Sequence, residues 1–176
     1  SAGGITVNKN VNASMGSTVI GVASGSGGIV LGGDGTLTLG GGAGVQLYTS
    51  GGSITQTNAV TTGMSNLFMY TMGTGAIQLD NSNNDFSWVQ VDPGYKAGSI
   101  SLADANNLNL GSLTAMTGTV QVVAGGALNV QDAINSGNSD VNLTGSSITF
   151  TAAGDISAGS GKISLVSTGV GANTSI

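Results

Sequence analysis

The chain has no cysteine, histidine, arginine or glutamate, and its one proline is Pro93. It therefore lacks most of the side chains that proteins use as general acids, nucleophiles and metal ligands. Without arginine it also cannot hold an anionic group bidentately, as enzymes acting on acidic sugars often do. We therefore expect no enzyme activity, no metal site and no cofactor. The lack of cysteine indicates only that no disulfide is needed, and leaves the redox compartment open.

Charge is also scarce, and it is mostly negative. Eight aspartates and three lysines give a net charge of −5 and an isoelectric point near 4.1. Lys9, Lys96 and Lys162 cannot form a basic patch, so we expect neither nucleic acid nor an anionic membrane surface as a partner. Apolar residues occur singly or in short groups, never in the run of about 18 that a membrane-spanning helix needs. The sequence therefore predicts no membrane span.

The chain does contain a repeated apolar doublet whose two members are separated by one residue. Side chains alternate along a β-strand, so both members of a doublet point to the same face. The clearest series starts every 20–22 residues and consists of Ile100/Leu102, Val120/Val122, Val141/Leu143 and Ile163/Leu165.

Two further series have the same period in the same part of the chain. One consists of Leu108/Leu110, Leu128/Val130 and Ile148/Phe150, and the other of Leu113, Ile134 and Ile156. Three interleaved series with one period indicate three short strands per turn of a coil, stacked so that each series forms an interior column. The sequence therefore predicts an all-β fold, a parallel β-helix (β-solenoid) of about eight coils with about 20–25 residues each. The richness in glycine (32 residues), with abundant Asn and Ser, fits the many turns.

The pattern continues toward the N-terminus at longer intervals. Ile5, Ile29, Ile54 and Ile77 extend the first series. We assign Leu37/Leu39 and Val89/Val91 to the second series, and Val19, Val45/Leu47 and Leu67/Met69 to the third. We expect a single domain over residues 1–176, with looser coils over 1–99 and regular coils over 100–176, either part of a longer chain or one unit of a stacked assembly.

Large side chains gather in two stretches, residues 64–72 and 81–96. In a strand, Phe68 and Tyr70 would point opposite to Leu67 and Met69, so one pair should face outward. One interpretation is core filling with a local flap over the wall of the solenoid. The other is an exposed patch that contacts a partner. The candidate patch consists of Met64, Phe68, Tyr70, Met72, Trp88 and Tyr95.

Only aspartates remain as candidates for chemistry. Asp80, Asp85 and Asp92 could in principle supply a glycosidase-like carboxylate pair, but they lie in a turn-rich stretch where Asp is a common turn residue. Asp34, within Leu31-Gly32-Gly33-Asp34-Gly35, is similar to a calcium-binding glycine-rich repeat, but that repeat works only in tandem, and here it occurs once. Turn formation is the better interpretation for all four aspartates.

Two parts of the chain together resemble a known family of repeats. They are Ala76-Ile77-Gln78-Leu79, Asn83-Asn84-Asp85-Phe86 and the run Ile100 to Gly111 in one part, and Val120 to Ile134 in the other. They resemble the repeat units of filamentous-haemagglutinin-type bacterial adhesins, the large exoproteins of two-partner secretion. The resemblance extends over residues 76–166 and implies a right-handed parallel β-helix, secretion and a place at the bacterial cell surface. It covers the shaft of such proteins, without the Asn-Pro-Asn-Gly elements of their secretion domain and without a receptor-binding motif.

Three functions follow as expectations. The first is an extracellular structural or adhesive shaft that contacts a host-cell or polysaccharide surface. The second is a subunit that stacks end to end or laterally into a filament, sheath or surface layer, because solenoid ends expose unpaired strands. The third is a carbohydrate-binding or carbohydrate-active β-helix, for which Trp88, Tyr95, Asp85 and Asp92 are the candidates.

Overall fold

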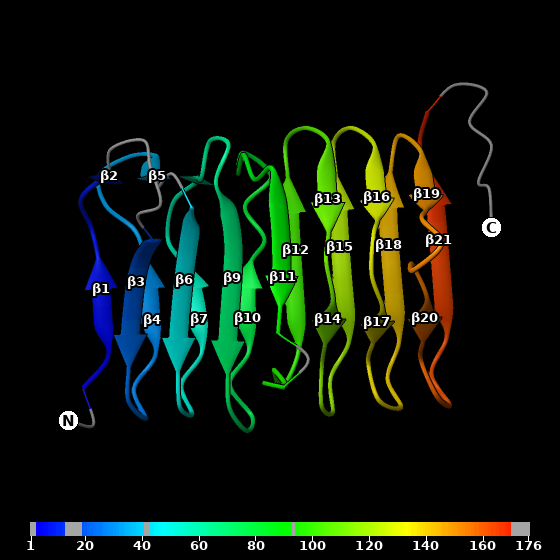
Figure 1. Cartoon of the computed structure of the whole chain (residues 1–176), viewed down its shortest axis with the longest axis horizontal. Helices are drawn as coiled ribbons and strands as arrows, with labels where there is room; N and C mark the ends of the chain where they lie inside the picture. Colours follow the sequence, from blue (N-terminus) through cyan, green and yellow to red (C-terminus); the bar gives the residue numbers. More distant parts are fainter. Residues whose placement is uncertain (1–2, 13–18, 41–42, 93, 170–176) are drawn as a thin grey trace.

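The chain winds as a right-handed parallel β-solenoid in a computed structural model that describes residues 3–12, 19–40, 43–92 and 94–169 (Figure 1). Within these ranges every regular element is a β-strand, and every strand pairing is parallel. In Figure 1 successive coils advance from the blue N-terminal end to the red C-terminal end, with the strands of each side running in one direction. The predicted fold class is confirmed.

The longest side of the solenoid is an eight-stranded sheet, which we call sheet 1. Its strands contain the first apolar series in direct register, from Ile5 opposite Ile29 to Val141 opposite Ile163. Eight passes of the chain enclose about seven complete turns. The strands are β1 (Ile5–Val7), β4 (Ile29–Leu31), β7 (Ile54–Gln56), β10 (Ile77–Leu79), β12 (Ile100–Asp104), β15 (Val120–Ala124), β18 (Val141–Gly145) and β21 (Ile163–Ser167).

The second side, sheet 2, has seven strands and corrects part of the series assignment. Val19, Val45/Leu47 and Leu67/Met69 were assigned to the third series, but their strands join the sheet that carries the second series. The interval between doublets shows how long a coil is, but not at which corner the extra residues lie. The strands are β3 (Val19–Ser24), β6 (Gly44–Thr49), β9 (Asn66–Thr71), β11 (Trp88–Val91), β13 (Leu108–Leu110), β16 (Leu128–Val130) and β19 (Ile148–Phe150).

The short third side changes position halfway along the solenoid. In the first coils it follows sheet 1, as β2 (Val11–Asn12), β5 (Leu37–Gly40) and β8 (Val60–Thr61). In the last coils it follows sheet 2, as β14 (Leu113–Thr114), β17 (Ile134–Asn135) and β20 (Ile156–Ser157). Leu37/Leu39 therefore belong to this short side, and their assignment to the second series was wrong. The Leu113, Ile134 and Ile156 series is confirmed.

One coil joins the two arrangements. This coil has a single-residue parallel β-bridge at each of the two corners. Asp85 pairs with Thr61 at one corner, and Ala97 pairs with Ala115 at the other. Phe86, next to the first bridge, is the largest fully buried side chain and is 1% exposed. A bulky ring at this position fills the interior where the cross-section changes shape, since protein interiors tolerate few voids.

A buried amide holds the same corner together. The Asn84 side chain is fully buried and donates to the backbone carbonyls of Leu79 at 3.0 Å and Ala103 at 3.1 Å. Its Oδ1 accepts the Val60 N–H at 2.8 Å, and Gln56 contacts both ends of the amide. These bonds link three successive coils, so Asn84 contributes hydrogen bonds to buried backbone groups at the corner where the side changes.

The close stacking of coils requires glycine at the turn before sheet 1. A Cβ at Gly75 would come within 2.2 Å of the Gly52 carbonyl oxygen, and one at Gly98 within 2.4 Å of the Thr74 carbonyl oxygen. Any larger residue there would force the coils apart.

Candidate functional site

Five of the seven aromatic residues lie on the outer surface of sheet 2, which we call the aromatic face. Strand alternation places them there, because Leu67 and Met69 of β9 are fully buried while Phe68 and Tyr70 between them point outward. Tyr48 of β6 pairs directly with Tyr70 across the sheet. The members are Tyr48, Phe68, Tyr70, Trp88 and Tyr95, all half-buried.

The five rings form two contacting groups. Tyr95, in the turn after β11, meets Tyr48 with ring centroids 6.0 Å apart and Tyr70 with centroids 5.5 Å apart, both edge to face. Phe68 and Trp88 form the second group at 5.2 Å. Such aromatic pairs contribute about 0.5–1.5 kcal/mol beyond their buried area, so each ring restrains its neighbours.

Trp88 is held on three sides. Phe68 lies on one side, and the indole N–H donates to Gln131 Oε1 at 3.3 Å, two strands further along the sheet. Beneath the ring lies Gly111, where a Cβ would come within 2.5 Å of Trp88 Cζ2 and 2.9 Å of Cη2. The six-membered ring of the indole therefore rests against backbone that only glycine leaves accessible.

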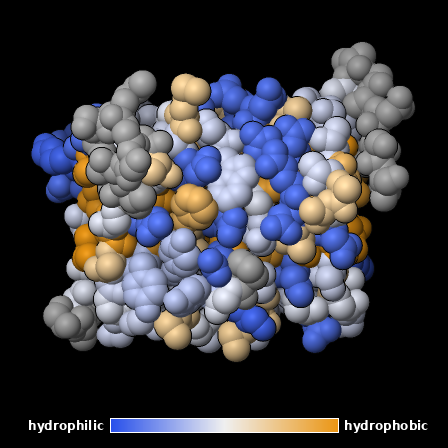
Figure 2. Space-filling model, in the orientation of Figure 1, coloured by the Kyte–Doolittle hydropathy of each residue, from blue (hydrophilic) through white to orange (hydrophobic). Residues whose placement is uncertain are grey.

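A row of polar side chains continues from Trp88 across sheet 2. Successive register positions hold Trp88, Asn109, Asn129 and Thr149. Asn129 Nδ2 donates to Asn109 Oδ1 at 3.0 Å, and the Thr149 hydroxyl donates to Asn129 Oδ1 at 2.6 Å. The front of the molecule in Figure 2, where the strands of sheet 2 lie, mixes hydrophilic and apolar side chains.

The aromatic face carries little charge. Burial, with smaller contributions from Asp92 and Tyr95, raises the pKa of Tyr70 above its ordinary value. The Tyr70 phenol thus stays neutral and keeps its proton over the whole physiological range. Asp92 also closes its own turn, since its Oδ1 accepts the Gly94 N–H at 2.8 Å.

The structure brings most of the predicted patch together. Phe68, Tyr70, Trp88 and Tyr95 lie on the aromatic face, and the Tyr48 hydroxyl reaches the Met72 sulfur at 3.5 Å. Met64 is 97% exposed in the turn before β9, at the opposite end of that strand from Met72.

Sequence reasoning missed two members of this surface. Tyr48 follows the inward-facing Leu47, as Tyr70 follows Met69, so the doublet pattern already placed it outside. Gln131 had no comparable signal, because its contact with Trp88 depends on which strands are neighbours.

The candidate aspartates lie in or beside turns, and two of them accept hydrogen bonds from side chains of the neighbouring coil. Asp85 Oδ1 accepts from the Asn106 amide at 3.2 Å, and Asp80 Oδ2 accepts from the Ser101 hydroxyl at 3.2 Å. Asp34 is exposed in a turn. Among the residues described, no three His, Cys, Asp or Glu side chains gather into a group able to hold a metal ion.

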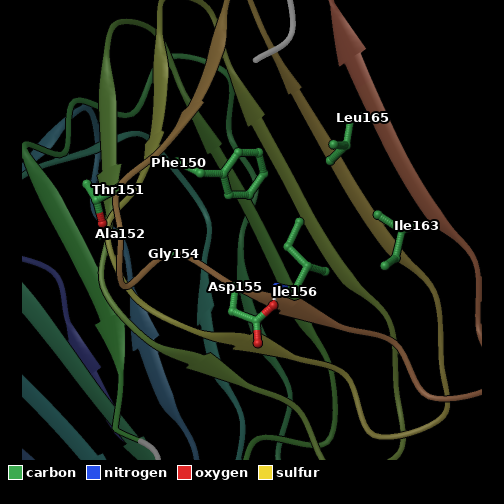
Figure 3. Close-up of a pocket in the computed structure, with 8 residues that line it drawn as sticks. All are labelled: Phe150, Thr151, Ala152, Gly154, Asp155, Ile156, Ile163 and Leu165. Carbon is green, nitrogen blue, oxygen red and sulfur yellow. Dashed lines mark hydrogen bonds between the residues drawn. The ribbon is translucent and has the colours of Figure 1, made fainter. Parts of the chain in front are cut away.

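A second candidate surface is the hollow at the last coil, a cavity of about 540 Å³. Figure 3 shows Phe150 of β19, Ile156 of β20, and Ile163 and Leu165 of β21 directed into it. Ile163 occupies an interior column yet is 50% exposed. Among the described residues, no further strand covers these interior columns beyond β21.

Comparison of the chain with family models, curated proteins and solved structures gives no match. The part of the chain covered by the structure contains no helix long and apolar enough to cross a membrane.

Proposed function

We propose that this chain is a rigid, non-enzymatic shaft of an extracellular bacterial surface protein, with adhesive contacts made from its side. The observation that carries the proposal is the unbroken register of sheet 1 from Ile5 to Ile163. Each coil supplies the hydrogen-bond partners of the next and buries its aliphatic columns, so bending would break both along the whole length. The resemblance of residues 76–166 to haemagglutinin-type repeats supports the location and the adhesive role.

The rigidity of the shaft can be tested with two spin labels on one column of sheet 1. Thr6→Cys and Gln121→Cys place labels on outward positions five strands apart, and the chain has no native cysteine. At about 4.8 Å per strand, a rigid stack predicts one narrow distance distribution near 24 Å, widened only by the label arms. Electron–electron double resonance measures that distribution, and urea provides the unfolded control. A broad or multi-peaked distribution in native buffer would contradict a rigid shaft.

The 50% exposure of Ile163, an interior-column residue, supports a second candidate, end-to-end stacking of copies into a filament. β1 carries Ile5 and Val7 at the spacing of Ile163 and Leu165 in β21, so a second copy could continue sheet 1. The short third side lies at opposite corners in the first and last coils, however, so such a junction would match on two sides only. For this reason the shaft is the leading proposal.

Electron microscopy of two matched variants separates these candidates. Ile163 and Val166 of β21 are similarly exposed, at 50% and 45%, but Ile163 points into the interior and Val166 outward. Stacking predicts fibres of the wild-type protein that Ile163→Lys abolishes and Val166→Lys retains. Isolated short rods of the wild-type protein at high concentration would contradict stacking.

A further inference from the structure

We propose that the aromatic face is a binding site for a neutral polysaccharide chain, which lies across sheet 2 over Trp88 and the amide row beside it. This inference deepens the adhesive part of the proposed function and rests on it. It follows from how the rings are held, what surrounds them and which charges are present.

The rings are prearranged for contact. Trp88 is fixed by Phe68, Gln131 and the backbone of Gly111, and the three tyrosines brace one another edge to face. Because the rings are already held in place, the protein loses little side-chain entropy when a ligand stacks on them. The loss of side-chain entropy is one of the main free-energy costs that oppose binding. Five of the seven aromatic rings lie half-buried on this one side. The core does not need them, because Phe86 fills the interior where the cross-section changes.

The surroundings of the rings match the chemistry of a sugar. A pyranose ring has an apolar face of C–H groups and a rim of hydroxyls that both donate and accept hydrogen bonds. Aromatic rings stack on such faces, while amide side chains offer both donors and acceptors to hydroxyls. Asn109 and Asn129 occupy the register positions next to Trp88 on the two following strands. Gln131 accepts a hydrogen bond from the indole N–H and donates one to Asn109. Aromatic rings thus lie next to amide groups on this surface. Ligand sites commonly combine apolar walls with a few polar groups in this way.

The charges select a neutral ligand over an acidic one. Asp92 lies beside Tyr70, and Lys96 follows Tyr95, so the aromatic face combines one carboxylate with one exposed ammonium group. Lys9 and Lys162 belong to the first and last coils. A uronate- or sulfate-bearing chain would find too few cations to offset its desolvation and would meet a protein of net charge −5.

A substitution beneath the ring provides a sharp test. Gly111→Ala adds one methyl that would meet Trp88 Cζ2, so it displaces the indole without removing it or touching an interior column. Trp88→Ala removes the ring itself. Gln121→Ala, at an exposed position on the outer face of sheet 1, is the matched control.

The experiment titrates the whole chain with cellohexaose and laminarihexaose as neutral probes and with polygalacturonate as the acidic probe. Calorimetry reports binding by every variant, and fluorescence of Trp88, the single tryptophan, is a second readout where that residue is kept. Circular dichroism checks that each variant is folded. We expect saturable binding of at least one neutral probe and none of polygalacturonate. Trp88→Ala should abolish it, Gly111→Ala should weaken it at least tenfold, and Gln121→Ala should leave it unchanged.

Three results would overturn the inference. They are no saturable binding of either neutral probe, wild-type affinity retained by Trp88→Ala or by Gly111→Ala, and concentration-dependent self-association in sedimentation that Trp88→Ala removes. The last result would identify the aromatic face as a contact between copies. None of the three affects the spin-label test of the rigid shaft, so failure of the sugar site is distinguishable from failure of the proposed function.

Discussion

At the residue scale, Asn84 is the polar side chain on which the change of cross-section depends. Asn84→Ala would leave the Val60 N–H and the carbonyls of Leu79 and Ala103 buried without that partner. The Leu79 carbonyl keeps its partner in the ladder of β10 and β12, so two groups become unsatisfied. Each unsatisfied buried group costs about 1–3 kcal/mol, so we expect the free energy of unfolding to fall by at least about 2 kcal/mol. Urea denaturation measures the loss. Asn83→Ala, at the exposed neighbouring position, is the control, and an equal effect of both variants would show that the network carries no stability.

A second prediction at the residue scale concerns Asp104, whose carboxyl group should make the free energy of unfolding depend on pH. This side chain is 2% exposed and accepts the N–H groups of Phe86 at 2.6 Å and Asn106 at 2.7 Å. Burial raises the pKa of Asp104 above 3.8; the two hydrogen bonds lower it by less, and nearby Asp85 adds to the rise. The folded state therefore binds the proton more tightly than the unfolded state does. The contribution of this proton to stability is complete below pH 3.8 and is lost as the pH rises through the folded pKa.

Comparison with Asp104→Asn isolates this effect. The free energy of unfolding of the wild-type protein, minus that of Asp104→Asn, should be larger at pH 4 than at pH 7. Urea denaturation at several pH values measures it, and Asp132→Asn supplies the comparison curve of an exposed carboxylate. A difference that stays constant or shrinks on acidification would contradict the assignment.

At the element scale, alternation along each strand separates the core from the outer surface. Val122 and Val123 of β15 are adjacent, but Val122 is fully buried and Val123 is 38% exposed. Val122→Asp places a carboxylate in an aliphatic column and should cost about 3–5 kcal/mol or prevent folding. Val123→Asp should change stability by less than about 1 kcal/mol. Thermal and urea unfolding of the pair test the prediction, and similar melting of both variants would contradict the strand phase.

The same alternation explains why some element assignments could be made from the sequence and others could not. Doublets reveal strands and their inward faces, so Phe68 and Tyr70 could be placed opposite to Leu67 and Met69. The doublet at Leu37/Leu39 looks like any other, although it lies on the short third side. Its side depends on which corner absorbs the extra residues of a longer coil, and corners tolerate insertions at little cost in free energy.

At the scale of the whole molecule, stability should vary along the solenoid axis. An inner coil has two neighbours that complete its hydrogen bonds and cover its columns, whereas β1 and β21 each pair with one strand among the residues that the structure describes. Local opening should therefore be easier at these two strands than in β10, β12 and β15. Hydrogen exchange with mass spectrometry should show slower exchange over residues 77–124 than over 5–7 and 163–167. Uniform protection along the axis would contradict a stack of nearest-neighbour coils.

The sequence by itself determined the solenoid, its parallel register along sheet 1 and the inward columns. A period-2 apolar pattern that recurs every 20–25 residues buries all its apolar side chains when the coils stack in register. The tertiary structure decided where the third side lies, that Asn84 bridges three coils, that Tyr95 contacts Tyr48 and that Gln131 contacts Trp88. Those features depend on which coils stack on which and on how the corners turn. Contacts between residues distant in the sequence leave no local signal in a single chain.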